Sequence, residues 1–107
     1  MTETVSTGSQ EIFKLDLRGA FLRRTNLSFA NLERVNLSRA DFSNADFTGA
    51  DFRDAILDGT ILKGADLTGA KNLIKAQLRR AVLDENTKLP EEFSISEILG
   101  EFAAAGN

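Results

Sequence analysis

The sequence of 107 residues is long enough for one small domain, and its formal net charge of -3 favours neither a polyanion-binding protein nor a strongly acidic one. The absence of cysteine and histidine excludes disulfide bonds, thiolate metal sites, cysteine nucleophiles and histidine acid–base catalysis. No run approaches the ~18 apolar residues that a membrane span requires.

The N-terminal residues 1–10 are polar and rich in Ser and Thr. They lack the basic start and the apolar run of a secretory signal peptide. We therefore expect residues 1–11 to form a flexible tail, and we expect a cytoplasmic protein.

A five-residue repeat follows this tail. Every fifth residue between positions 17 and 67 is Leu or Phe, and the residue before it is Asp or Asn in eight of eleven cases. A period of five drifts about 140° per repeat around an α-helix, and on a straight strand it sends alternate residues to opposite faces. The large residues share one interior only if the chain bends once per repeat. The spacing therefore predicts a coiled chain, with glycine at some corners: Gly19, Gly49, Gly59 and Gly64.

The repeats also resemble a known family. Residues 40–44, Ala-Asp-Phe-Ser-Asn, and the two repeats after them resemble the A(D/N)LXX pattern of the pentapeptide-repeat family, and the resemblance covers about residues 13–85. It implies an all-β solenoid, a right-handed quadrilateral β-helix with four pentapeptides per coil. Residues 81–90 resemble the closing segment of small cyanobacterial members. We expect this β-helix over residues 12–85, with a one-residue insertion near residues 71–72.

Four sides of five residues place residue n beside residue n+20 on the next coil, about 4.8 Å away. The Leu or Phe of each repeat then points inward and stacks on its counterparts in the neighbouring coils. The spacing resumes after the insertion. The predicted core consists of Leu17, Leu22, Leu27, Leu32, Leu37, Phe42, Phe47, Phe52, Leu57, Leu62, Leu67, Leu73, Leu78 and Leu83.

The C-terminal part predicts a cap. Pro90 marks the end of the coil, and residues 94–97, Ser-Ile-Ser-Glu, have a capping-box sequence. The apolar residues that follow fall on one helical stripe: Ile95, Ile98, Leu99 and Phe102. Within residues 86–107 we expect a linker and a short α-helix, about residues 96–104, that covers the last coil.

Outward aspartates are the first candidates for chemistry, because Asp41, Asp46 and Asp51 follow one another around one coil. A solvated ladder is the main interpretation, and a DNA-mimicking acidic face and a catalytic carboxylate pair are the alternatives. Nothing desolvates one carboxylate to raise its pKa, as acid catalysis requires. The nonapeptide of calcium-binding solenoids is missing. We predict no catalytic residue, no cofactor and no metal site.

A basic cluster precedes these aspartates and consists of Arg18, Arg23, Arg24, Arg34 and Arg39. Residues 13–39 carry six basic and two acidic side chains, net +4, whereas residues 40–70 carry two basic and six acidic ones, net -4. The spacing of 20 places Glu33 beside Arg53 and Arg34 beside Asp54, so ion pairing between coils is the main interpretation. A protein-binding charge pattern and a nucleic-acid site are the alternatives.

Apolar residues occupy three positions where Asp or Asn is usual, and with Val82 they form the candidate interaction surface: Phe21, Ile56, Ile61 and Val82. The sequence favours a non-catalytic structural or protein-interaction module. We expect another protein as its partner, no nucleic acid and no membrane, and a monomer or weak homodimer. The alternative function is a DNA-mimicking protein that interacts with a topoisomerase such as gyrase.

Overall fold

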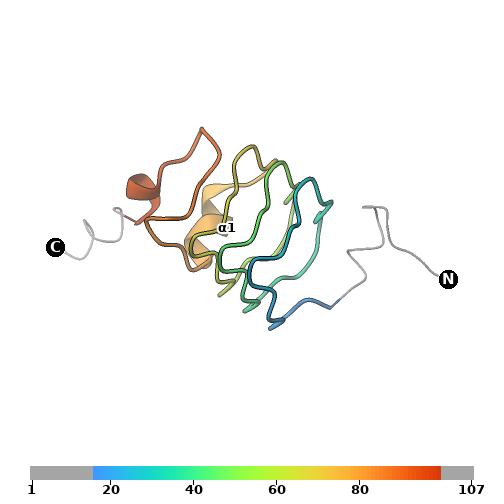
Figure 1. Ribbon diagram of the computed structural model, residues 1–107. Coiled ribbons are helices and arrows are strands. Elements are labelled where there is room, and N and C mark those ends of the chain that lie inside the picture. The colour runs from blue at the N-terminus through green and yellow to red at the C-terminus, as the bar shows by residue number, and fades with distance from the viewer. Residues whose placement is uncertain (1–15, 100–107) are drawn as a thin grey trace.

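The computed structural model describes residues 16–99, which wind into a stack of coils (Figure 1). Parallel bridges join residues 20 apart in the first coils, for example Phe21 to Asp41 and Asp41 to Ile61. Each contact uses both backbone groups, since the Asp41 N–H donates to the Ala20 carbonyl and the Asp41 carbonyl accepts from the Leu22 N–H, both at 2.8 Å. Residues 16–99 form these isolated bridges and no longer strand.

Each side of a coil ends in a tight turn. In the turn of residues 42–45, for example, the Phe42 carbonyl accepts the Ala45 N–H at 3.0 Å. The third residue of this turn, Asn44, has a φ of 60°. A turn of this kind requires a positive φ at its third residue, which favours Gly. Glycine occupies this position at Gly19, Gly49, Gly59, Gly64 and Gly69. Several other turns place Arg, Phe, Asn or Asp there: Arg24, Phe29, Arg34, Arg39, Asn44 and Asp54.

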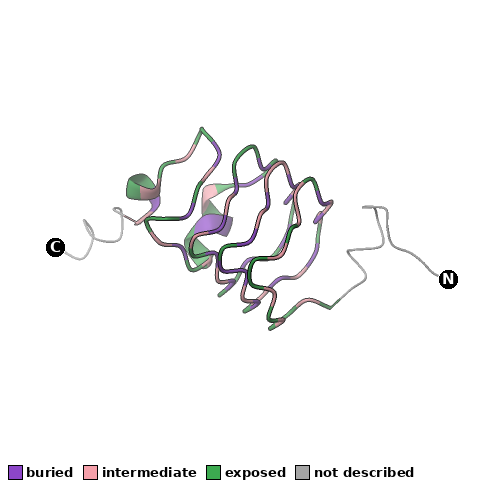
Figure 2. Cartoon of the chain, viewed as in Figure 1, coloured by how far each residue is buried: buried purple, intermediate pink, exposed green. Residues whose placement is uncertain are grey.

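Large apolar side chains fill the interior of the coils. Buried residues recur along each coil, between exposed and partly buried ones (Figure 2). Eleven of the fourteen predicted core positions are buried: Leu32, Leu37, Phe42, Phe47, Phe52, Leu57, Leu62, Leu67, Leu73, Leu78 and Leu83. The rings of Phe42 and Phe47 pack edge to face with centroids 5.0 Å apart. The remaining three positions, Leu17, Leu22 and Leu27, lie in the first coil and are only partly buried.

A short helix interrupts the last coil, and the expectation of an all-β coil is wrong at this point. The helix, α1, spans Lys75–Arg80 and replaces one side of the coil. The pairing distance increases to 21 residues at Ile61–Val82, as the predicted insertion requires, and to 22 at Asp66–Lys88. The coil therefore continues to residue 88, beyond the expected limit at residue 85.

Gln77 joins α1 to the coil beneath it. In regular coils the carbonyl two residues before a core residue accepts a backbone N–H from the next coil, as the Ala50 carbonyl does from Lys71 at 2.7 Å. At Ala55 the helix removes that donor, and the Gln77 Nε2 donates instead at 2.9 Å. The same nitrogen donates to the Phe52 carbonyl, and Oε1 accepts the Ile74 N–H that begins the helix.

The C-terminal segment is helical at residues 95–99. The Ser94 hydroxyl accepts the Glu97 N–H at 3.1 Å, which is one half of the predicted capping box. Ile98 is buried in the common core, with Phe93, Ile95 and Leu99 packed against it. The tail over residues 1–11 and the rest of the expected helix, with Phe102, lie outside the described residues.

Candidate interaction surfaces

The outward Asp and Asn residues hold the turns that follow them. The Asp46 Oδ1 accepts the Thr48 N–H at 2.9 Å and the Thr48 hydroxyl at 2.6 Å, and Asp41 does the same with Ser43. Asn31 accepts the Glu33 N–H at 3.0 Å. This is the side-chain-to-backbone pattern that favours Asx residues in turns. The Asp and Asn side chains of this ladder therefore support the fold at the repeats that contain them.

These hydrogen bonds stabilise the ionised carboxylates. The hydroxyl and N–H of Thr48 lower the pKa of Asp46, and those of Ser43 lower the pKa of Asp41. The Asn72 side chain lowers the pKa of Asp51. A general acid needs a raised pKa, so these aspartates are unsuited to that role. No cluster of acidic side chains among residues 16–99 is arranged to hold a metal ion.

The ion pairs observed between coils differ from those that the 20-residue spacing predicts. Within residues 16–99, Glu33 forms no ion pair with Arg53, and Arg34 forms none with Asp54. The backbones are nevertheless in register, because the Arg34 N–H donates to the Arg53 carbonyl at 2.8 Å. Arg34, Arg53 and Asp54 are exposed and Glu33 is partly buried. An ion pair between exposed side chains gains little against its loss of side-chain entropy. The ion pairs that do join coils link Arg23 to Asp41 at 3.8 Å and Arg80 to Asp58 at 3.7 Å.

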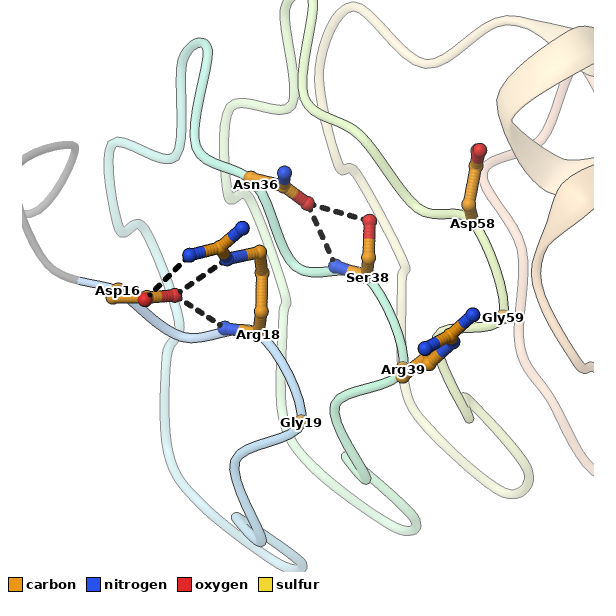
Figure 3. A pocket seen from close by; sticks show the side chains of 8 residues that line it. All are labelled: Asp16, Arg18, Gly19, Asn36, Ser38, Arg39, Asp58 and Gly59. Carbon is orange, nitrogen blue, oxygen red and sulfur yellow. Dashed lines mark hydrogen bonds and ion pairs between the residues drawn. The ribbon is translucent and has the colours of Figure 1, made fainter.

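A shallow polar groove of about 780 Å³ lies over one side of the first coils, and sequence reasoning missed it. Figure 3 shows its lining residues: Asp16, Arg18, Gly19, Asn36, Ser38, Arg39, Asp58 and Gly59. Arg18 is bound to Asp16 at 2.8 Å and lowers the pKa of that carboxyl to about 2. Asn36 is bound to the Ser38 N–H. Most polar groups of the groove are thus used by its own turns.

The predicted apolar surface is divided between two sides of the rod. Ile61 bridges to Val82, and Asp41 separates Ile61 from Phe21 on the same side. Phe21 is 74% exposed, and the Arg23 guanidinium lies 5.8 Å from the centre of its ring. Ile61 is partly buried and Val82 is exposed. Ile56 is exposed on the adjacent side, beside Asn36.

Two further exposed apolar residues were not among the candidates. Phe29 is 75% exposed at a turn position, and its ring covers the space beside the Cα of Gly49. Ile74 is exposed at the start of α1. The five-residue frame places Phe29 outward, but it gives no signal for Ile74 because the frame does not predict the helix.

Comparison with known proteins decides the family. The profile of the pentapeptide repeats matches eight copies over residues 14–44 and 45–84. The chain belongs to the pentapeptide repeat family. No curated protein matches the sequence.

Solved structures of the family agree with the coiled architecture. A pentapeptide repeat protein of the cyanobacterium Cyanothece 51142 is 31% identical with a TM-score of 0.55, over 65% of this chain and 47% of that one. The chain thus spans about half the length of that relative. Together with the parallel pairing of neighbouring coils, this likeness implies a right-handed β-helix.

Two more distant structures also match. A pentapeptide repeat protein of Nostoc Pcc 7120 is 25% identical with a TM-score of 0.32, over 82% of this chain and 87% of that one. A thylakoid-lumen pentapeptide repeat protein of Arabidopsis thaliana is 24% identical with a TM-score of 0.22, over 69% and 61%. Within residues 16–99, no helix has the length and apolarity to cross a membrane.

Proposed function

We propose that the protein is a non-catalytic interaction module that binds another protein through the apolar residues on the sides of its coils. The observation that carries the proposal is the loss of the turn-holding acceptor at Phe21, Ile56 and Ile61. Asp or Asn at the equivalent positions accepts the N–H two residues on. Phe and Ile have no acceptor.

Apolar residues at these three positions are unfavourable for the stability of the coil. A hydrogen bond of this kind contributes about 0.5–1.5 kcal/mol. At Phe21 and Ile56 the exchange also leaves a large apolar side chain exposed to water. Neither the turn nor the core explains these residue types, whereas contact with a partner does, because the buried centre of a protein interface is more apolar than the rest of the surface and is enriched in aromatic residues.

The test uses substitutions that return the repeat to its own pattern. The double variant Phe21→Asn with Ile61→Asn restores both acceptors, so its stability is expected to equal or exceed that of the wild type. We expect it to lose the protein that the wild-type chain captures from an extract of its native cells. Asp46→Asn with Asp66→Asn is the matched control, since it changes the same repeat position on another side and keeps the acceptor. Capture that is equal for all three proteins refutes the proposed surface.

We also propose that the C-terminal segment, residues 90–99, caps the last coil. Residues 90–99 pack Ile98 into the core, where it is 1% exposed, and α1 is tied to this segment by a Lys75–Glu97 ion pair at 3.3 Å. Removing residues 91–107 is expected to expose the edge of the last coil, so that the rods associate end to end. Light scattering checks this. A truncated chain that stays monomeric and equally stable refutes the cap.

The cytoplasmic location and the monomeric or weakly dimeric state stay predictions. Cell fractionation tests the first, and light scattering of the full chain over a range of concentrations tests the second.

A further inference from the structure

The first coil presents an edge of backbone groups that later coils use for pairing. In the second coil, the N–H groups of Asp41, Asp46 and Asp51 donate to the coil before them at 2.8–2.9 Å. The equivalent N–H groups of the first coil belong to Phe21, Asn26 and Asn31, and none of them donates to a residue in the range 16–99. We name residues 21–35 the N-terminal edge.

The core is also less covered at this edge. Leu22 and Leu27 are partly exposed, whereas Phe42 and Phe47, which stand above them in the second coil, are completely buried. A segment that paired with the N-terminal edge would therefore gain backbone hydrogen bonds and would bury these leucines as well. Addition of an extended segment to an exposed edge is a common mode of peptide recognition.

The charge of this end selects the chemistry of the segment. Residues 16–39 contain five arginines and two acidic residues. Arg24 and Arg34 are exposed on the N-terminal edge, and neither forms an ion pair with any residue in the range 16–99. A second copy that presented the same edge would bring arginines against arginines, which is unfavourable. An acidic segment is complementary.

We propose that the N-terminal edge binds an extended acidic segment of a partner protein, which adds one further layer to the coil. This inference rests on the interaction role proposed above and assigns it a second surface. The segment carries a large apolar residue every five positions to cover Leu22 and Leu27, with an acidic residue two positions after it, beside Arg24 and Arg34. Three sides of the coil accommodate fifteen residues, because each side has five.

The probe is a synthetic peptide of three Ala-Asn-Leu-Ser-Asp repeats, in which Leu stacks on the core leucines and Asp lies beside Arg24 and Arg34. Its control is the same peptide with Lys in place of Asp. Fluorescence anisotropy with the full chain is expected to show binding of the acidic peptide only, weaker at high salt. Arg24→Glu with Arg34→Glu is expected to weaken binding about tenfold or more. Lys63→Glu with Lys88→Glu makes the same change in net charge at least two coils from the edge and is expected to leave affinity within about twofold. Equal weakening by both pairs, or no binding, overturns the proposal.

Hydrogen exchange locates the bound segment. We expect the amides of Phe21, Asn26 and Asn31 to exchange rapidly in the free chain and to become protected when the acidic peptide binds. Protection in the free chain at all concentrations means that the protein's own N-terminal residues occupy the edge. Protection that increases with protein concentration means that a second copy does. Either result overturns the proposal. The interaction role itself is tested separately by Ile61→Asn alone, because Ile61 lies two coils from the N-terminal edge.

Discussion

One side-chain oxygen in each regular repeat holds the turn that follows it. The Oδ1 atom of Asp41 or Asp46 accepts both an N–H and a hydroxyl from the residue two positions on. Asn26 provides the same contacts to Ser28. The repeat therefore requires the acceptor and not the charge, which explains why Asp and Asn alternate freely at this position.

Where the acceptor is Asp, the folded chain is expected to lose stability in acid. The pKa values of Asp41, Asp46 and Asp51 are lowered in the folded chain, so the unfolded chain binds protons more readily. Their contribution is fully present above the unfolded pKa of about 3.9 and is lost as the pH falls through the lower folded values. The triple variant with Asn at all three positions keeps the acceptors, and its melting temperature is expected to vary less with pH below about 4. Identical pH dependence in the variant and the wild type would contradict this account.

Two phenylalanines test the register residue by residue. Phe47 is completely buried between the rings of Phe42 and Phe52, with centroid distances of 5.0 and 5.3 Å. Phe47→Ala is expected to lower the free energy of unfolding by about 3–5 kcal/mol, the usual effect of a large core cavity. Phe29→Ala removes a ring that is 75% exposed and is expected to change it by less than about 1 kcal/mol. Urea denaturation measures both, and equal losses mean that the register is wrong.

At the level of elements, the side chain of Gln77 compensates for the backbone donor that α1 takes out of the coil. Gln77 accepts the Ile74 N–H and donates to the carbonyls of Phe52 and Ala55 at 2.9 Å. Gln77→Glu keeps the acceptor but places a carboxylate against two carbonyls. We expect a loss of about 1–3 kcal/mol in the free energy of unfolding, because both carbonyls lose their donor and a charge is buried. Ala76→Glu, at the exposed neighbouring position of the helix, is the control and is expected to be nearly neutral. A neutral Gln77→Glu would show that water replaces the amide.

The same element explains what the sequence could and could not predict. A five-residue spacing of large apolar residues predicts a coiled chain with these residues inside, so the core positions follow from it. The number of sides does not follow from the spacing. The resemblance to the pentapeptide-repeat family implied four sides, and with them the pairing of Phe21 with Asp41. Leu73 and Leu78 keep this spacing through the helix, which hides the change of structure. The available signal was the composition of residues 75–80, good helix formers without a corner glycine. The second added residue, before Lys88, has no signal in the spacing.

At the scale of the whole molecule, the distribution of charge along the rod argues against DNA mimicry. A duplex carries one phosphate per about 1.7 Å of axis, whereas one outward position on one side of the coil recurs only about every 4.8 Å. The column that begins at Asn26 continues through Asp46 and Asp66 and ends at Lys88. The neighbouring column has Asp51 as its only acid and ends at Lys71. Both of these columns thus end in a lysine, and the arginine-rich first coil lies at the other end of the rod.

We therefore expect the protein neither to inhibit supercoiling by DNA gyrase nor to protect the enzyme from quinolones, at low micromolar protein and physiological salt. A site built to receive a polyanion is basic, so Lys71, Lys88 and the first-coil arginines would oppose binding. Supercoiling assays with the wild type and with Asp46→Asn plus Asp66→Asn check this, and both are expected to match a reaction without added protein. The Asn pair keeps the turn acceptors, so it removes two charges without removing the hydrogen bonds. Inhibition by the wild type that weakens in this variant would show that the acidic column is a gyrase-binding face after all.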